Sequence, residues 1–286
     1  AFIASCFVIK KILDTLEKEN LTIPTLIFFG LSMGTITMVL YQRMYMVLTF
    51  FILLYFYYSI QLYKNKFELT PKFSVKLGIT TVLGFLTQYY FAIYAFFILI
   101  IMIIRMIKDK EYKNMAKYIG LHIIYAIIGV LIFVPCVHHL LSSERGISNF
   151  GNTDYINHLL KYIQYLAYAF TIEADIGLMV ILMLIIVGAV IYLIKKNKDV
   201  FVILLTLIPS IIYFLLTVKL TSYQEFRYIM PVIPFVVLTI MIILDDIFEF
   251  KYKNICILFI SILFIIFGFI YSSPKFLFEE YQSSLD

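Results

Sequence analysis

Long apolar segments separated by short polar stretches run through almost the whole chain. Residues 21–40 and 46–63 are apolar, and they flank the polar group Tyr41-Gln42-Arg43-Met44-Tyr45. Each run is close to the roughly 20 residues that a helix needs to cross the hydrocarbon of a bilayer. The pattern predicts about ten membrane-spanning helices: the tail of a first one at 1–9, then 21–40, 46–63, two within 77–107, 118–140, 176–194, 200–218, 228–244 and 255–271.

The apolar run at 77–107 allows two interpretations, one tilted helix or two short helices that turn at Gln88. Lysine and arginine are enriched in the cytoplasmic loops of membrane proteins, so the distribution of charge distinguishes them. With the turn, seventeen of the 23 Lys and Arg residues fall on one side of the membrane; with one helix the division is nearly even. The hairpin is therefore the prediction, and it places Gln88 and Tyr89 on the same outer side as Arg43.

The longest polar stretch, residues 141–175, contains a segment with helical periodicity at 155–171. Apolar residues recur there every three to four positions, while polar residues such as His158 and Lys161 fall between them. The pattern predicts an amphipathic helix in the outer interface, and a weak transmembrane helix is the alternative. Residues 1–271 are expected to form one helical membrane domain and 272–286 an outer tail. Because the chain opens inside an apolar segment, the rest of a first span is expected upstream of it.

Composition agrees with a membrane protein. The chain is 63% hydrophobic and 14% charged, with a mean hydropathy of +0.97, whereas soluble domains carry about 25% charged residues. The apolar runs are far longer than the strands of a membrane barrel, so an all-α bundle is the predicted fold class. The three cysteines lie in or beside apolar runs without metal-ligand spacing, and neither a metal nor another cofactor is predicted.

The predicted outer face gathers the polar residues that could carry chemistry. It holds Arg43 beside Tyr45, the turn with Gln88 and Tyr89, and Arg227, whereas the inner face holds short lysine-rich loops without a phosphate-binding glycine loop. A simpler interpretation is that the arginines are interfacial anchors and the tyrosines an aromatic belt. If the protein does chemistry, the sequence places it on the outer side, away from cytoplasmic nucleotides.

Three segments together resemble the GT-C superfamily of integral membrane glycosyltransferases. They are the span that ends in residues 41–45 (Tyr-Gln-Arg-Met-Tyr), the turn at 86–90 (Leu-Thr-Gln-Tyr-Tyr), and residues 226–234 (Phe-Arg-Tyr-Ile-Met-Pro-Val-Ile-Pro). The most similar branch is that of the bacterial relatives of dolichyl-phosphate-mannose protein mannosyltransferases and of the lipid A aminoarabinose transferase. The resemblance implies transfer of a sugar from a polyprenyl-phosphate donor to a lipid, glycan or protein acceptor at the outer face of the cell membrane, without nucleic acid.

Such a reaction requires cations that meet the phosphate leaving group and a carboxylate that deprotonates the acceptor. Arg43 and Arg227 are the candidates for the phosphate, and Tyr45, Gln88 and Tyr89 are expected to line the same site. The family keeps its acidic catalytic residue in a first outer loop that this chain lacks, and it often has Lys where Gln88 stands. The catalytic residue is therefore unknown from the sequence, although three carboxylates lie on the expected side: Glu173, Asp175 and Glu225.

Three other functions remain open at this point. A transporter or flippase of lipid-linked sugars would also be polytopic, but Asp, Glu, Lys and Arg are absent from the middle of every predicted span, which counts against ion-coupled transport. A polysaccharide ligase or polymerase shares the lipid-linked donor. A structural or assembly protein would not need arginines and amides gathered on one face.

Overall fold

The computed structural model describes residues 1–40, 44–141, 154–170, 176–221, 225–248 and 252–271. These residues are almost entirely helical, and no strand occurs among them. The helices are α1 (Phe2–Thr15), α2 (Thr22–Leu31), α3 (Met33–Leu40), α4 (Tyr45–Lys64), α5 (Pro71–Thr87), α6 (Tyr90–Lys108), α7 (Tyr112–Ile132), α8 (Pro135–Leu141), α9 (Tyr155–Phe170), α10 (Ile176–Lys195), α11 (Phe201–Leu220), α12 (Ile233–Ile247) and α13 (Lys253–Tyr271), with 3-10 turns η1 (Glu19–Leu21) and η3 (Phe226–Val232).

Five helical segments are long and apolar enough to cross a membrane, namely α4, α6, α7, α11 and the continuous stretch Phe226–Ile247. A sixth span is reached if the bent pair Glu19–Leu31 and Met33–Leu40 counts as one. The all-α fold class is confirmed and the helices indicate a membrane protein, but the described residues do not support about ten spans. The predicted span at 21–40 bends by 60°, where Ser32 has extended backbone angles. Helices α1 and α5 have only 14 and 17 residues, and within α10 and α13 only the shorter apolar stretches Val180–Lys195 and Lys253–Leu263 are found.

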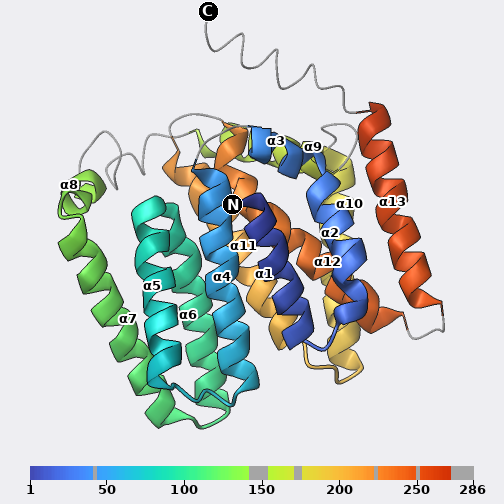
Figure 1. Ribbon diagram of the computed structural model, residues 1–286. Helices are drawn as coiled ribbons and strands as arrows, with labels where there is room; N and C mark the ends of the chain where they lie inside the picture. Colours follow the sequence, from blue (N-terminus) through green and yellow to red (C-terminus); the bar gives the residue numbers. More distant parts are fainter. Residues whose placement is uncertain (41–43, 142–153, 171–175, 222–224, 249–251, 272–286) are drawn as a thin grey trace, which may run out of the picture.

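The helical hairpin at Gln88 is confirmed, because α5 ends at Thr87 and α6 begins at Tyr90. Figure 1 shows that the turns after α1, α4, α6 and α10 all lie at one end of the bundle. These turns contain the lysine-rich loops of the sequence, and we call this end the basic end. The α5–α6 turn lies at the opposite end, together with α3, α8 and α9 (Figure 1).

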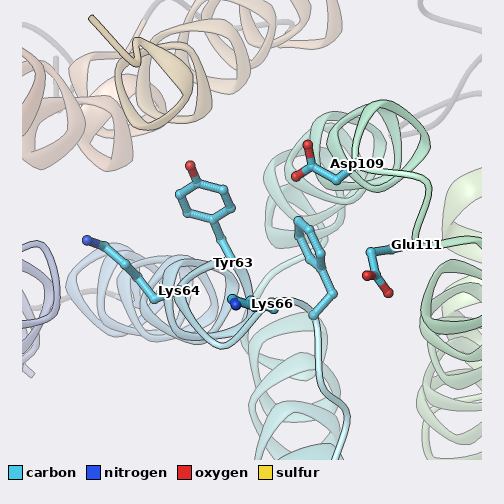
Figure 2. Close-up of a pocket in the computed structure, with 6 residues that line it drawn as sticks. Tyr63, Lys64, Lys66, Asp109 and Glu111 are labelled. Atoms are coloured by element: carbon cyan, nitrogen blue, oxygen red, sulfur yellow. The ribbon is translucent and has the colours of Figure 1, made fainter.

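Four helices at the basic end finish with the same backbone motif. Glu17, Lys66, Lys110 and Asn197 each have positive φ, between 51° and 62°. The next amide in each case bonds to the carbonyl five residues back, as Lys18 N–H does to Leu13 at 2.9 Å, and the positive-φ residue's own amide bonds three residues back. This is the Schellman arrangement, which usually has glycine at the left-handed position. The turns after α4 and α6 lie side by side, as Figure 2 shows.

The α10–α11 turn is tied to its neighbours by Asp199. Its carboxylate accepts hydrogen bonds from the Phe201 amide at 3.0 Å and from the Tyr63 hydroxyl at 2.5 Å, and Arg105 lies 3.5 Å away. Burial by itself would raise the pKa of Asp199, but these hydrogen bonds and the charges of Arg105 and Lys108 outweigh burial and lower the pKa below its usual value.

Helix α9 lies with α3 across the end of the bundle opposite the basic end (Figure 1). Its extent, Tyr155–Phe170, confirms the predicted helix at 155–171 to within one residue. Its apolar side is buried against α3, α10, α11 and η3. A Cβ added to Gly34 of α3 would lie 2.8 Å from the Cβ of Ala169, so glycine is what lets the two helices meet closely.

Candidate functional site

The sequence-predicted Arg227 lies in η3, the turn that follows α11 at the end opposite the basic end. Its side chain is 16% exposed, and its guanidinium pairs with Glu225 through two nitrogens, Nη2 donating to Oε1 at 2.6 Å and Nε contacting Oε2. The guanidinium carbon also lies 5.1 Å from the centre of the Tyr228 ring. The η3 segment thus holds a partly buried ion pair between Arg227 and Glu225, with the guanidinium over the Tyr228 ring.

Two further sequence-predicted residues, Tyr45 and Gln88, lie beside this pair. Tyr45, at the start of α4, is 4% exposed, and its ring packs edge-on against Tyr228 with centroids 5.9 Å apart. The Gln88 side chain lies near the Tyr45 phenol. Gln88 caps α5 with extended backbone angles, and its Oε1 accepts the Tyr89 amide at 3.0 Å.

We call these five residues, Tyr45, Gln88, Glu225, Arg227 and Tyr228, the η3 cluster. They come from the start of α4, the end of α5 and the segment around η3, so residues distant in the sequence meet at one place. The sequence analysis gave Glu225 only as one of three carboxylates on the expected side and did not single out Tyr228 as a site residue. The ion pair between Glu225 and Arg227, two positions apart, is the feature it did not foresee.

Tyr89 points to a different neighbourhood. Its ring stacks on Phe133, with centroids 6.5 Å apart and planes 26° apart, and lies 5.7 Å from Phe85. The structure therefore places Tyr89 beside the end of α7, separate from the η3 cluster. Arg43, Glu173 and Asp175 lie outside the described residues.

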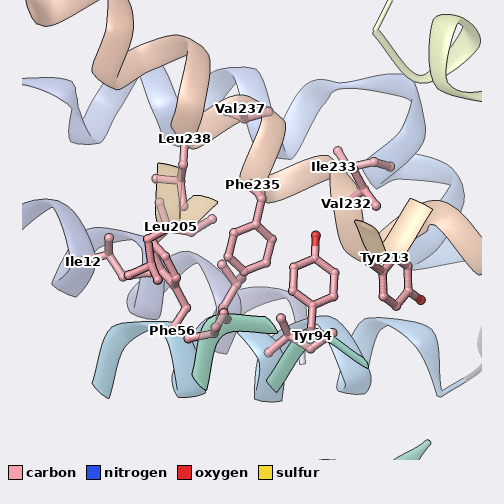
Figure 3. Close-up of a cluster of buried hydrophobic side chains, with 14 of the residues drawn as sticks. Ile12, Phe56, Tyr94, Leu205, Tyr213, Val232, Ile233, Phe235, Val237 and Leu238 are labelled. Atoms are coloured by element: carbon pink, nitrogen blue, oxygen red, sulfur yellow. The ribbon is translucent and has the colours of Figure 1, made fainter. Parts of the chain in front are cut away.

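A column of aromatic rings in contact with one another begins at Tyr228 of the η3 cluster and runs into the core. Tyr228 contacts Tyr90 at 5.8 Å between centroids, Tyr90 contacts Tyr213 at 6.1 Å, and Tyr213 contacts Tyr94 at 4.7 Å. Tyr94 then stacks on Phe235 at 5.0 Å, deep in the core, as Figure 3 shows. Because these rings fill the space below the cluster, a long lipid chain bound there would have to lie along the outside of the column.

Helix α9 packs against the end of α11. The Tyr162 hydroxyl lies 2.9 Å from the Thr221 hydroxyl at the end of α11. Burial raises the pKa of Tyr162 to about 12. Its phenol is therefore neutral at ordinary pH and acts as a hydrogen-bonding group in a protein interface.

His122 is a partly buried polar residue that the sequence analysis missed. It is the central residue of α7, its Nε2 lies 2.8 Å from the Tyr55 hydroxyl, and its Nδ1 lies 2.8 Å from the Tyr118 carbonyl. A carbonyl only accepts, so Nδ1 carries the proton and Nε2 accepts from Tyr55. The predicted span began at Tyr118, which put His122 near the start of the span. The helix α7 begins at Tyr112 instead, so His122 lies in its middle.

Neither a family model, a curated protein nor a solved structure matches this chain. Within the described part of the chain, no group of three or more His, Cys, Asp or Glu side chains could hold a metal ion. The chemistry of the η3 cluster therefore has to be argued from its own residues.

Proposed function

We propose that the protein is a membrane glycosyltransferase that moves a sugar from a polyprenyl-phosphate donor to an acceptor hydroxyl, with the η3 cluster at its active site. The observation that carries the proposal is the Arg227 guanidinium, held by Glu225 among Tyr45, Gln88 and Tyr228 at the end of the bundle opposite the lysine-rich loops. By the positive-inside rule that end faces outward from the cell membrane.

The reaction breaks the bond between the sugar C1 and the phosphate oxygen and forms one between C1 and the acceptor oxygen. The negative charge that develops on the leaving phosphate needs a fixed cation, and arginine meets a phosphate with two parallel hydrogen bonds. Arg227 already offers two nitrogens, Nη2 and Nε, to one carboxylate. In the proposed complex the donor phosphate takes the place of Glu225 on these nitrogens.

Glu225 supplies the second requirement. Once the phosphate displaces it, its carboxylate stands next to the reacting centre and accepts the proton of the acceptor hydroxyl. Gln88 and Tyr45 provide an amide and a phenol that can hydrogen bond to sugar hydroxyls. Arg43 is the second cation proposed for the phosphate, on sequence grounds.

The experiment is transfer of labelled sugar from a panel of polyprenyl-phosphate sugars in membranes that contain the full chain. Arg227→Ala is expected to lower transfer at least 100-fold, because one charge-stabilising donor typically contributes that much, and Arg227→Lys is expected to restore only part of it. Lys161→Ala removes a cation on α9, at the same end, and is expected to leave transfer within about twofold. Equal transfer by wild type and Arg227→Ala, at equal expression, would refute the proposed role.

A second candidate, a transporter of lipid-linked sugars, is favoured by two observations. The α2–α3 pair is a bent helix of the kind that transporters use at substrate sites, and His122 is an ionisable group in the middle of a span. Proteoliposomes that contain a lipid-linked sugar in one leaflet separate the candidates. Movement of the intact lipid without formation of a product would favour the transporter, and product formation would favour the transferase.

A further inference from the structure

A pocket of about 410 Å³ opens at the basic end, between the turn that follows α4 and the turn that follows α6 (Figure 2). It is far from the η3 cluster, at the other end of the bundle, and the proposed function does not involve it. The lining consists of two lysines, two carboxylates and two aromatic side chains: Lys64, Lys66, Asp109, Glu111, Tyr63 and Phe67.

The backbone on both sides of the pocket is held in place by the helix ends. Lys66 and Phe67 are consecutive residues with positive φ, 51° and 62°, and the Phe67 amide bonds to the Leu62 carbonyl at 2.8 Å. Across the pocket, the Glu111 amide bonds to the Met106 carbonyl at 2.8 Å. Because these bonds fix where the charged side chains start, the pocket is formed before a ligand arrives.

The charges of the lining are separated in space. Figure 2 shows the lysines on the α4 side and the two carboxylates toward the α6–α7 turn. Asp109 is bonded to Arg105 at 2.8 Å and Glu111 accepts from Asn114 at 2.9 Å, so both carboxylates are held in position. The C-terminal end of the α6 dipole adds to the attraction for a cation on that side.

The lysines are available to an anion. Lys64 reaches only Glu17, which is 84% exposed, at 3.5 Å, and such exposed pairs contribute little. Lys66 forms no ion pair with any residue that the structure describes. A ligand that is only anionic would meet two carboxylates, and one that is only cationic would meet two lysines, so the pocket suits a group with both charges.

We propose that this pocket binds a phosphoethanolamine group, with its phosphate on Lys64 and Lys66 and its primary ammonium on Asp109 and Glu111. Phe67 and Tyr63 offer apolar surface to the short carbon bridge between the two charges. The pocket lies where α4 and α6, two membrane-spanning candidates, end, which is the depth of lipid head groups. The group can arrive on a phospholipid or as soluble phosphoethanolamine.

The test is the melting temperature of the purified full chain in detergent, read with a thiol-reactive dye that reports exposure of its free cysteines on unfolding. A phospholipid with an ethanolamine head group is expected to raise the melting temperature by about 3 °C or more at tenfold excess over its Kd. The choline and glycerol head groups are expected to raise it less, because trimethylammonium cannot donate hydrogen bonds and glycerol carries no positive charge. A rise with soluble phosphoethanolamine alone would identify a soluble ligand.

Lys66→Ala and Glu111→Gln are each expected to abolish the difference between head groups, while Lys72→Ala, which removes an exposed lysine outside the pocket, is expected to preserve it. Glu111→Gln keeps an oxygen for Asn114, so its melting temperature without lipid is expected to match that of wild type. Equal rises for all three head groups, or an unchanged difference in both pocket variants, would overturn the proposal.

Discussion

Replacing Asp245 with asparagine removes the centre of a charge network at the basic end. The Asp245 side chain is 8% exposed and forms ion pairs with Lys18 and Lys253, each at 2.6 Å. It also accepts a hydrogen bond from Asn20 at 3.2 Å. One carboxylate thus ties the chain before α2 to the end of α12 and the start of α13.

The expected loss of stability follows from what the two lysines retain. Removing one partner of a buried ion pair typically costs about 3–5 kcal/mol, because the other charge is left unpaired in a poor solvent. Lys18 keeps Asp246 at 2.5 Å, and the Lys253 side chain, 31% exposed, can reach water. Both facts reduce the penalty, so we expect Asp245→Asn to lower the free energy of unfolding by about 2–3 kcal/mol.

The assay is reversible unfolding in mixed micelles of a mild detergent and SDS, followed by far-UV circular dichroism. Glu17→Gln is the matched control, because it removes a carboxylate from an exposed pair at 3.5 Å and is expected to change stability by less than about 0.5 kcal/mol. In a double-mutant cycle with Lys18→Met, the coupling energy is expected to exceed about 1 kcal/mol. If Asp245→Asn is no more destabilising than Glu17→Gln, the network does not stabilise the fold and the reasoning is wrong.

Three further predictions concern helix ends, helix contacts and pH. Lys110→Gly is expected to stabilise the protein by about 1 kcal/mol, because φ of 62° strains a residue with a Cβ. Lys108→Gly, at the last residue of α6, is expected to destabilise it by at most about 1 kcal/mol, and unfolding curves of both variants measure the contrast. Gly34→Ala is expected to lower the free energy of unfolding by about 1–3 kcal/mol, because the new Cβ would lie 2.5 Å from an isoleucine side chain of α12. Gly188→Ala, with no atom within 4 Å of the new Cβ, is expected to be neutral or stabilising. Melting temperatures of the two variants check both expectations. Because the pKa of Asp199 is lowered in the folded protein, its ionised form stabilises the fold at pH values above the unfolded-state pKa of about 4. This contribution disappears as the pH falls through the lower folded-state pKa. The difference in unfolding free energy between wild type and Asp199→Asn should therefore be constant from about pH 7 to pH 5 and shrink in the acid range.

The features that sequence predicted best follow from strong local patterns. The turn at Gln88 and the segregation of the lysine-rich loops came from charge counting, and the helix at Tyr155–Phe170 came from its apolar periodicity. The meeting of Tyr45, Gln88 and Arg227 at one end of the bundle followed from the same topology. Periodicity and charge are both properties of short segments, so a single sequence carries them.

The features that sequence could not predict depend on backbone geometry and packing. Apolar composition continues through Ser32, so the 60° bend between α2 and α3 leaves no mark on hydropathy. Lys66 and Lys110 adopt left-handed angles without the glycine that usually signals them, which concealed the turns that form the basic-end pocket. Tyr89 stacks on Phe133 rather than on Tyr228, and only the three-dimensional packing of α7 decides that.

The four Schellman turns at the basic end bear on how this protein is made. Each turn is closed by bonds that span at most five residues, such as Phe67 N–H to Leu62 and Lys198 N–H to Leu193. A turn of this kind needs no distant segment, so it can form as soon as its own residues leave the ribosome. The turns of the α4–α5, α6–α7 and α10–α11 hairpins can therefore be set during synthesis, before the rest of the bundle is made.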